Sequence, residues 1–264
     1  MAGRLTNKKV LCVVTGSSRG IGAEVARLLG SRVSKESVFV LTARSEASFQ
    51  QQQLDLQQAH KLFCCDLEKF GQADVERFGA TLEEALALRA PQSAKFDVAL
   101  VVHNAGTIGD VGERVADYAD VGKTDAYFHV NVTSMAAMNS VFLQKCRGAA
   151  ERVFVVNVSS LAAVKPFASF GYYGAGKAAR DSLLRVLAVE EPSLRVLNYS
   201  PGPIRTAMTA HIEANSHADD VRGIFKGLRE EETFVKVADS VEKLYGILDR
   251  DEFASGALID YYDD

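Results

Sequence analysis

Short apolar runs alternate with longer amphipathic stretches along this chain of 264 residues. Most of the short runs are apolar and β-branched at consecutive positions, which is typical of strands covered on both faces of a sheet. The longer stretches have the periodicity of helices. Strands are predicted at residues 10–14, 38–42, 61–65, 98–102, 153–158, 195–198 and 257–259. Helices are predicted at residues 20–30, 46–59, 67–89, 125–147, 170–190 and 238–249.

A regular alternation of strand and helix predicts a parallel sheet with right-handed crossovers and helices on both faces. We therefore expect one α/β domain over residues 1–264, a Rossmann-type doubly wound sheet of about seven strands. The Gln-rich run at residues 50–58 predicts a solvated helix face. Residues 207–234 break the rhythm with many charges and few long apolar runs, so they form either a surface excursion or a mobile lid.

Composition narrows the class of protein. The net charge of -4 and the pI of about 5.8 leave no basic stripe for a nucleic acid. No apolar run approaches the roughly 20 residues that span a bilayer, and the N-terminus lacks an apolar signal core, so we expect a cytoplasmic protein without a membrane partner. The four cysteines have no metal-ligand spacing, which predicts buried reduced thiols and no metal site.

A glycine-rich turn lies between the first strand and the first helix. Glycines let the backbone approach a pyrophosphate, and the helix N-terminus supplies N–H groups and a positive dipole. The spacing Gly-x-x-x-Gly-x-Gly differs from the commonest dinucleotide fingerprint, but its place between strand and helix is that of a nucleotide site. The alternative is a tight turn that holds no ligand. The residues predicted to bind the cofactor here are Gly16, Ser18, Arg19, Gly20, Ile21 and Gly22.

The end of the second strand indicates which dinucleotide binds. An NAD site usually places an acidic residue there for the ribose 2′-hydroxyl. This chain instead has Arg44 and Ser45, and its first carboxylate is Glu46. With Arg19 in the glycine turn, two guanidiniums could face one 2′-phosphate. We therefore predict NADP, in its reduced form NADPH, as the cofactor.

Polar residues also end the next three strands. Asp66, followed by Leu67, could accept a hydrogen bond from the adenine amino group or could cap the following helix. Asn104 stands in a run of small residues that leaves room for a cofactor. Ser159 and Ser160 follow the fifth strand, where a serine can also simply bond to local backbone.

Tyr173 and Lys177 lie four positions apart in a helix predicted to begin near Phe170, which places them on one face. A free tyrosine has a pKa of about 10 and exchanges protons poorly near neutral pH. A neighbouring ammonium favours the ionised phenol. The pair is therefore a plausible acid/base device, although Tyr and Lys also share helix faces by chance.

Taken together, these motifs resemble the short-chain dehydrogenase/reductase family in order and spacing over nearly the whole chain. Ser160 precedes Tyr173 by thirteen positions, the commonest separation in the family. The resemblance implies that Ser160 polarises a substrate carbonyl, Tyr173 donates a proton, Lys177 holds the nicotinamide ribose and Asn131 positions a relay water. His103 departs from the more usual asparagine, at a position that concerns the strand more than the chemistry.

The same resemblance extends to the segment after the sixth strand. It implies that Ile204 and Thr206 wrap the nicotinamide carboxamide, that Gly202 faces the substrate, and that residues 207–234 form the substrate lid. It also implies a homodimer built from the helices at residues 125–147 and 170–190.

Within the family, the chain looks most similar to members that reduce pterins. The similarity lies in residues 104–111, 175–181 and 196–203 and in the C-terminal residues 255–263. It implies NADPH-dependent reduction of pterin side-chain carbonyls, as in sepiapterin and 6-pyruvoyl-tetrahydropterin, in tetrahydrobiopterin synthesis. Asp260 would anchor the pterin, because a carboxylate accepts two parallel N–H bonds from a 2-amino-4-oxo ring. The residues then expected to touch substrate are Ser159, Ser160, Tyr173, Gly202 and Asp260.

Two other functions stay open at this point. One is a short-chain carbonyl reductase for non-pterin ketones or diketones. The other is an NADPH-sensing protein without turnover, although such proteins usually lose the tyrosine or the lysine that this chain keeps.

Overall fold

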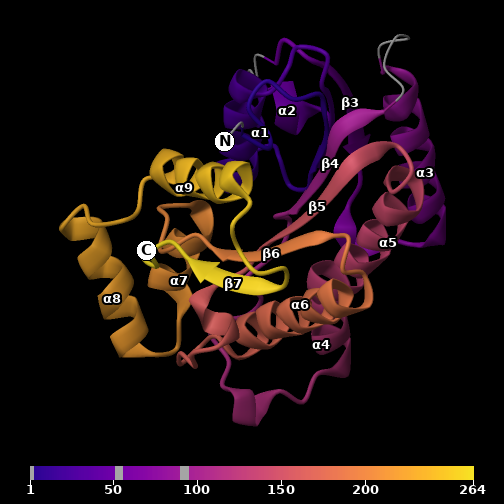
Figure 1. Ribbon diagram of the computed structural model, residues 1–264. Helices are drawn as coiled ribbons and strands as arrows, with labels where there is room; N and C mark the ends of the chain where they lie inside the picture. The colour runs from indigo at the N-terminus through magenta and orange to yellow at the C-terminus, as the bar shows by residue number, and fades with distance from the viewer. Residues whose placement is uncertain (1–2, 51–55, 90–94) are drawn as a thin grey trace.

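The computed structural model describes residues 3–50, 56–89 and 95–264, and these contain a seven-stranded sheet in the order β3-β2-β1-β4-β5-β6-β7 (Figure 1). Every neighbouring pair is parallel. The predicted fold class is therefore confirmed. The strands are β1 (Val10–Val14), β2 (Val38–Ala43), β3 (Ala59–Cys64), β4 (Phe96–His103), β5 (Ala150–Val158), β6 (Arg195–Ser200) and β7 (Ala257–Asp260).

Helices cover both faces of the sheet (Figure 1). Apolar side chains of α1 and α9 pack on one face, and those of α3, α5 and α6 pack on the other. Within the described residues, no helix is both long and apolar enough to cross a bilayer. The helices are α1 (Gly20–Arg32), α2 (Ala47–Gln50), α3 (Gln72–Ala87), α4 (Val121–Phe128), α5 (Ser134–Cys146), α6 (Gly171–Glu190), α7 (Ala207–Asn215), α8 (Asp219–Glu230) and α9 (Val237–Arg250).

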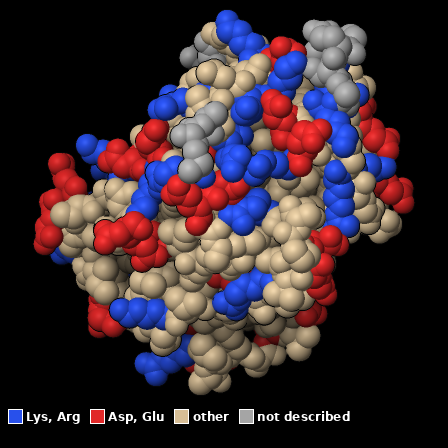
Figure 2. Space-filling model, viewed as in Figure 1, with Lys and Arg blue, Asp and Glu red and all other residues tan. Residues whose placement is uncertain are grey.

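The core follows from the alternation of side chains along the strands. In β1, Val10, Cys12 and Val14 face the α1 and α9 side, while Leu11 and Val13 face the α3, α5 and α6 side. Both sets are fully buried, as the consecutive apolar run predicted. The face of the molecule in Figure 2 has acidic and basic side chains interspersed, in keeping with the small net charge.

The helix predicted at residues 46–59 is wrong at its C-terminal end. Among the described residues of this span, the structure has a helix at Ala47–Gln50, residues 56–58 are not helical, and β3 starts at Ala59. Pairing of β3 with β2 along its full length outweighs local helix propensity here. Residues 51–55, which make up most of the Gln-rich run, lie outside the described residues. Its solvated helix face therefore stays a prediction.

Two further helices differ from their predicted spans. The helix predicted at residues 67–89 is divided into a 3₁₀ turn, Leu67–Lys69, and α3. The break falls at Gly71, which is extended and donates its N–H to Asp74 Oδ2 at 3.1 Å, so that it caps α3. The helix predicted at residues 125–147 begins earlier, as α4, and contains a π-helical turn at His129–Thr133 before α5.

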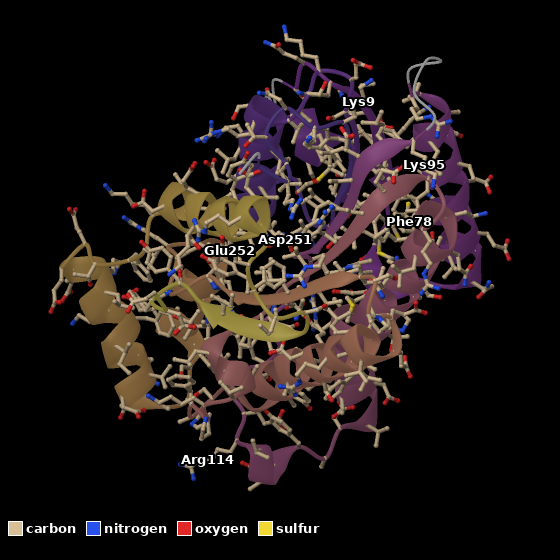
Figure 3. The ribbon with its side chains drawn as sticks, viewed as in Figure 1. Lys9, Phe78, Lys95, Arg114, Asp251 and Glu252 are labelled. Atoms are coloured by element: carbon tan, nitrogen blue, oxygen red, sulfur yellow. The ribbon has the colours of Figure 1, made fainter. Side chains whose placement is uncertain are left out.

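Asp251, labelled in Figure 3, connects the amino-terminal parts of β5 and β6. It follows α9 and adopts a left-handed conformation with φ of 56°. Its side chain is 5 % exposed. The carboxylate accepts from Arg195 Nε of β6 at 2.5 Å and from Arg152 Nη1 of β5 at 3.2 Å, and Arg4 Nε lies 3.7 Å away. One carboxylate thus connects two strands, the last helix and the N-terminal segment.

Replacing Phe78 in α3 (labelled in Figure 3) tests how the core is held. The ring is fully buried and meets Phe63 of β3 edge to face, with centroids 5.2 Å apart. Phe78→Ala should lower the free energy of unfolding by about 3–5 kcal/mol, because it removes apolar contacts and leaves a cavity. Urea unfolding followed by circular dichroism measures the change. Leu62→Ala, at a side chain 39 % exposed on the same strand as Phe63, is the matched control. Equal losses in the two variants would contradict this account of the core.

Candidate active site

Three positions of the turn after β1 require glycine. Gly16 and Gly20 have φ of 66° and 58°, a region that favours glycine. A Cβ at Gly22 would lie 2.4 Å from the Gly16 carbonyl oxygen. The three glycines therefore let the first turn of α1 fold back closely on the loop that precedes it, and a pyrophosphate can approach that backbone.

The turn is held from the side by β4. Asn104 Nδ2 donates to the carbonyl oxygens of Thr15 and Gly16 at 3.0 and 3.1 Å. Thr15 Oγ1 accepts from the backbone N–H groups of Asn104 and Ala105 at 2.9 and 3.0 Å. Asn104 was predicted to contact the cofactor, and in the structure its amide supports the loop that would contact it.

The N-terminus of α1 is open to an anion. Its N-cap residue, Arg19, makes no side-chain cap, so the first N–H groups of the helix have no side-chain acceptor there. The side chains of Arg19 and Arg44 are exposed, and neither is in an ion pair with the described residues. Ser18 and Ile21 are half-buried in the turn, and Ser45 Oγ lies 3.0 Å from Ser48 Oγ. These groups fit the phosphates of a dinucleotide.

Asp66 caps the 3₁₀ turn that follows β3. Its Oδ1 accepts from the Glu68 N–H at 3.2 Å, so the capping alternative is the one the structure displays. The other carboxylate oxygen has no protein donor among the described residues and stays available for an adenine amino group. Leu67 packs partly buried beside the core cluster of α3.

Ser160, Tyr173 and Lys177 come together where β5 meets α6. Ser160 caps a 3₁₀ turn, Leu161–Ala163, and its Oγ accepts from the Ala162 N–H at 3.2 Å. Lys177 Nζ donates to the Val158 carbonyl oxygen at 2.5 Å and lies 5.6 Å from the centroid of the Tyr173 ring. The helix thus places the amine beside the phenol, as the four-residue spacing predicted.

The electrostatics of these groups differ from those of free side chains. Burial raises the pKa of Tyr173, while a hydrogen bond with Ser160 and the charge of Arg180 lower it. Burial, with a smaller effect of Arg180, holds the pKa of Lys177 well below its usual range, and Asp181 opposes that shift. Tyr173 therefore keeps its proton at neutral pH and can donate it, which suits a general acid.

Asn131 lies in the π-helical turn between α4 and α5 and is 3 % exposed. Its Oδ1 accepts from the Thr107 N–H and its Nδ2 donates to the Tyr127 carbonyl, both at 2.9 Å. A Cβ at Gly106 would lie 2.7 Å from Asn131 Oδ1, so the loop after β4 passes directly over this amide. Single π turns often occur at functional sites, and this one re-aims Asn131 toward that loop.

Ser159 is placed differently from Ser160. Its side chain is 1 % exposed, and its Oγ donates to Asp181 Oδ2 at 2.7 Å. Asn157 Nδ2 donates to the other oxygen of the same carboxylate at 2.8 Å. The Ser159 hydroxyl therefore belongs to a buried network behind the site, although it was predicted to touch substrate.

The loop after β6 shapes the opposite wall. Gly202 has φ of 72°, and a Cβ there would lie 3.0 Å from Val235 Cγ2. Ile204 is buried and forms a parallel bridge with Val235. Thr206 caps α7 through reciprocal bonds with Thr209, at 2.9 and 3.3 Å. These contacts hold the loop at the carboxyl end of β6.

Asp260 ends β7 directly beside Ser200 of β6. Its Oδ1 accepts from the Tyr262 N–H at 3.0 Å, and its own N–H donates to Asp263 Oδ2 at 2.8 Å. The side chain is half-buried. The carboxylate is thus held at the carboxyl edge of the sheet with one oxygen that has no donor among the described residues.

Residues 207–234 form α7, α8 and their connections (Figure 1). Their apolar side chains meet the loop after β4 and the start of α6 in a small cluster that includes the Tyr173 ring. Residues of α7 and α8 therefore belong to the same apolar cluster as the Tyr173 ring. The members of the cluster are Ile108, Val111, Ile212 and Val221, with Phe170, Tyr173, Met208, Ala218 and Phe225 packed against them.

A cleft of about 590 Å³ lies beside this site and does not include its reactive groups. It is lined by the loop at residues 162–171, by residues 113–115 and by Ala175 and Ala178 of α6. Arg114 at its rim projects away from the sheet (Figure 3). The cleft therefore lies on the outer side of the helix whose other side carries Lys177.

Two groups of this site were not predicted from the sequence alone. Thr15 and the neighbouring pair Arg180 and Asp181 are buried and hydrogen-bonded at the carboxyl edge. The sequence did contain a signal for Arg180 and Asp181. Residues three and four positions after Lys177 lie on the same face of the helix, and two charged residues on a face expected to be buried indicate a specific role.

The sequence and the structure were compared with those of known proteins. A family model for short chain dehydrogenases matches residues 10–217. A sepiapterin reductase from Rattus norvegicus is 36 % identical over 257 residues, which cover 96 % of each chain. Among solved structures, the KRED1-Pglu enzyme superposes with a TM-score of 0.79 at 26 % identity, covering 95 % of this chain and 100 % of that one. A 3-oxoacyl-[acyl-carrier protein] reductase from Brucella melitensis, solved in complex with NAD, has a TM-score of 0.72 at 25 % identity and covers 96 % of both chains.

Gly22→Ala tests whether the turn after β1 holds a nicotinamide dinucleotide. The added methyl would meet the Gly16 carbonyl at 2.4 Å and force the turn open, so the dissociation constant for the cofactor should rise at least about tenfold. Fluorescence titration of the reduced cofactor measures it. Gly148→Ala, where a Cβ meets nothing within 4 Å, is the control. Unchanged affinity in a folded Gly22→Ala protein would contradict this placement.

Proposed function

Because this chain belongs to the short-chain dehydrogenase family, we propose that it reduces side-chain carbonyls of pterins with NADPH. Such an enzyme would act on sepiapterin or 6-pyruvoyl-tetrahydropterin in tetrahydrobiopterin synthesis. The single observation that carries the pterin assignment is the half-buried carboxylate of Asp260 at the carboxyl end of β7, one oxygen of which has no donor in the described parts of the chain. The likeness to sepiapterin reductases over 96 % of the chain supports it.

The proposed mechanism uses groups that are already positioned. A reduced nicotinamide supplies the hydride when it is bound. Ser160 would hydrogen-bond the substrate carbonyl oxygen and polarise it. Tyr173 would donate its proton to the same oxygen, and Lys177 beside it would stabilise the phenolate that is left. Asn131, held by Thr107 and Tyr127, would position water in the proton relay to Lys177.

NADPH is proposed over NADH because of the charges near the ribose. Arg44 follows β2 and Arg19 precedes α1, and both are exposed and unpaired within the described residues. Two guanidiniums can form forked, charge-assisted hydrogen bonds with a 2′-phosphate. No carboxylate stands at the end of β2, where an NAD site would use one for the 2′-hydroxyl.

We also propose that α7 and α8 act as the substrate lid and that the protein is a homodimer. The lid proposal is supported by the apolar contacts of these helices with Phe170 and Tyr173. The dimer proposal is supported by the outer side of α6, where large apolar side chains are exposed in a row. These are Leu183, Val186 and Val189, at 46 %, 51 % and 79 % exposure.

Reduction of non-pterin diketones is a second candidate function. The apolar cluster of the lid helices and Phe170 beside Tyr173 favours it, since such a wall binds any flat apolar ketone. The two candidates differ in their need for Asp260, because a diketone has no N–H edge for a carboxylate to recognise.

Replacing the phenol tests the acid role. Tyr173→Phe should lower kcat by about 10²- to 10⁴-fold, because it removes only the proton donor. The dissociation constant for NADPH should stay within about twofold, since the ring keeps its packing. Stopped-flow reduction and fluorescence titration measure the two quantities. A folded variant that keeps the wild-type kcat would eliminate Tyr173 as the acid.

Replacing Asp260 tests the substrate. Asp260→Asn keeps the shape but loses the charge, so kcat/KM for sepiapterin should fall by about 10- to 200-fold, the effect of losing a charged hydrogen-bond partner. Turnover of benzil, a diketone, should stay within about twofold. Asp264→Asn removes a charge four residues away at an exposed position and is the control.

The wild-type protein is assayed beside these variants with NADPH and with NADH. Equal losses of Asp260→Asn on sepiapterin and benzil would favour the general diketone reductase over the pterin enzyme. A preference for NADH would contradict the proposed role of Arg19 and Arg44.

A further inference from the structure

Two charged residues of α6, Arg180 and Asp181, lie buried directly behind the candidate acid/base pair, each 1 % exposed. They follow Lys177 by three and four positions, so all three share one face of the helix. Charged side chains are almost never fully buried without a partner, since the cost of removing a charge from water must be offset. Neither residue has a role in the mechanism proposed above.

Arg180 is bound without a counter-ion. Its Nη2 donates to the His103 carbonyl at 2.6 Å and its Nη1 to the Ala105 carbonyl at 3.0 Å, while Nε has no partner. No ion pair joins it to any residue in the described parts of the chain. Two carbonyl oxygens satisfy part of the guanidinium but do not neutralise it, and its burial lowers the pKa of Arg180 only to about 10. A positive charge therefore persists inside the protein at neutral pH.

The position of this guanidinium matters for the site. The carbonyls that it holds belong to residues on either side of Asn104, whose amide supports the glycine turn. A Cβ at Gly106 would lie 3.7 Å from Arg180 Nη1. Arg180 thus clamps α6, which carries Tyr173, to the loop that would carry the cofactor.

Asp181 faces the other way. It accepts hydrogen bonds from Ser159 at 2.7 Å and from Asn157 at 2.8 Å, one on each oxygen. Burial raises the pKa of Asp181, while these two hydrogen bonds and the charge of Lys177 oppose that shift. Asn157 on β5 and Ser159 directly after it flank Val158, whose carbonyl oxygen accepts from Lys177 Nζ. Arg180 and Asp181 therefore act on Lys177 with opposite signs.

We propose that Arg180 and Asp181 are positioning residues that set the charge state of the Tyr173–Lys177 pair by opposed fields, with Arg180 also fixing α6 against the end of β4. The proposal deepens the proposed function and rests on it for the role of Tyr173. Burial makes each field strong, because little water screens it. The charge of Arg180 lowers the pKa of both Tyr173 and Lys177, and the charge of Asp181 raises that of Lys177.

The other titratable groups around the pair do not carry this effect. His103 of β4 is buried and bonded to Asn139 at 3.1 Å, and burial, with the charge of Arg180, lowers its pKa to about 3, so it is neutral. Burial raises the pKa of Tyr127 of α4, so it also stays neutral. Arg185 acts on Asp181 from the exposed side of α6, where solvent screens it.

The expected signs follow from the charges. The two protons of the coupled pair titrate together, so the measurable quantity is the apparent pKa of the pair. Arg180→Met removes a positive charge, so the pair holds its protons more tightly and the apparent pKa rises. Asp181→Asn removes a negative charge and should lower it. Reduction needs a protonated Tyr173, so the pH at which kcat falls on the alkaline side should move up in the first variant and down in the second.

The experiment compares pH profiles of kcat for NADPH-dependent reduction. The alkaline limb should shift by about 1 pH unit or more upward in Arg180→Met and downward in Asp181→Asn. Arg180→Lys keeps the positive charge but loses the two guanidinium donors to the carbonyls of His103 and Ala105. The alkaline limb of its pH profile should therefore stay near that of the wild type while kcat falls. Arg147→Met, which removes an exposed arginine paired with Glu191 at 2.9 Å, is the control and should leave the profile unchanged.

A fall in kcat without any shift of the limb, or shifts of the same sign in Arg180→Met and Asp181→Asn, would overturn the proposal and leave a purely structural role. If circular dichroism finds Arg180→Met unfolded, Asp181→Asn and Arg180→Lys decide by the same criteria. The profiles are measured with benzil as well as sepiapterin, so a failure of pterin turnover is distinguished from a failure of this inference. Titrating the absorbance of tyrosinate gives the same apparent pKa without substrate. The part of this absorbance that is missing in Tyr173→Phe belongs to Tyr173.

Discussion

Parallel pairing of β1 with β4, and of β4 with β5, is the constraint on which the rest of this structure depends. Parallel strands bring their carboxyl ends to one edge of the sheet, so residues far apart in the sequence become neighbours there. Thr15 meets Asn104 across one of these pairs, 89 positions along the chain. The cofactor turn, the serine of β5 and the helix with Tyr173 all take their positions from this edge.

Polar groups at that edge replace the apolar packing of the rest of the sheet. The central strands β1, β4 and β5 are apolar through their middles, and polar residues are buried at or near the carboxyl ends of β1, β4, β5 and β6. These are Thr15, His103, Asn157 and Asn198. Buried polar groups are costly unless they find partners. Thr15 Oγ1 bonds to nearby backbone, His103 to Asn139 and Asn157 to Asn198. His103, Asn157 and Asn198 also each have one buried polar atom with no partner among the described residues. A network of this kind is rigid because each member has few alternative partners. Rigidity suits a site that must hold a proton donor beside a nicotinamide within tenths of an ångström.

The proposed acid/base pair and the proposed subunit contact share one helix. One side of α6 carries Tyr173, Lys177 and the buried charges, and its outer side shows an exposed apolar row. If the proposed dimer forms on that row, the partner subunit would stabilise the helix that carries the acid/base pair. Burial of the apolar row would then add to the restraint that Arg180 applies from within.

The sequence by itself determined the fold class, because strands buried on both faces must be apolar at consecutive positions, and helices that cover them must alternate with them. It also indicated Tyr173 and Lys177, since a four-residue spacing on a helix needs no tertiary information. What only the tertiary structure decided was how polar side chains are shared between segments. Ser159 and Ser160 are adjacent and alike in sequence, yet one is turned inward to Asp181 and the other stays with the phenol. The tertiary structure also decided that Ala59 belongs to β3 and not to the predicted helix. Pairing of β3 with β2 is a long-range interaction, and the local sequence pattern contains no signal for it.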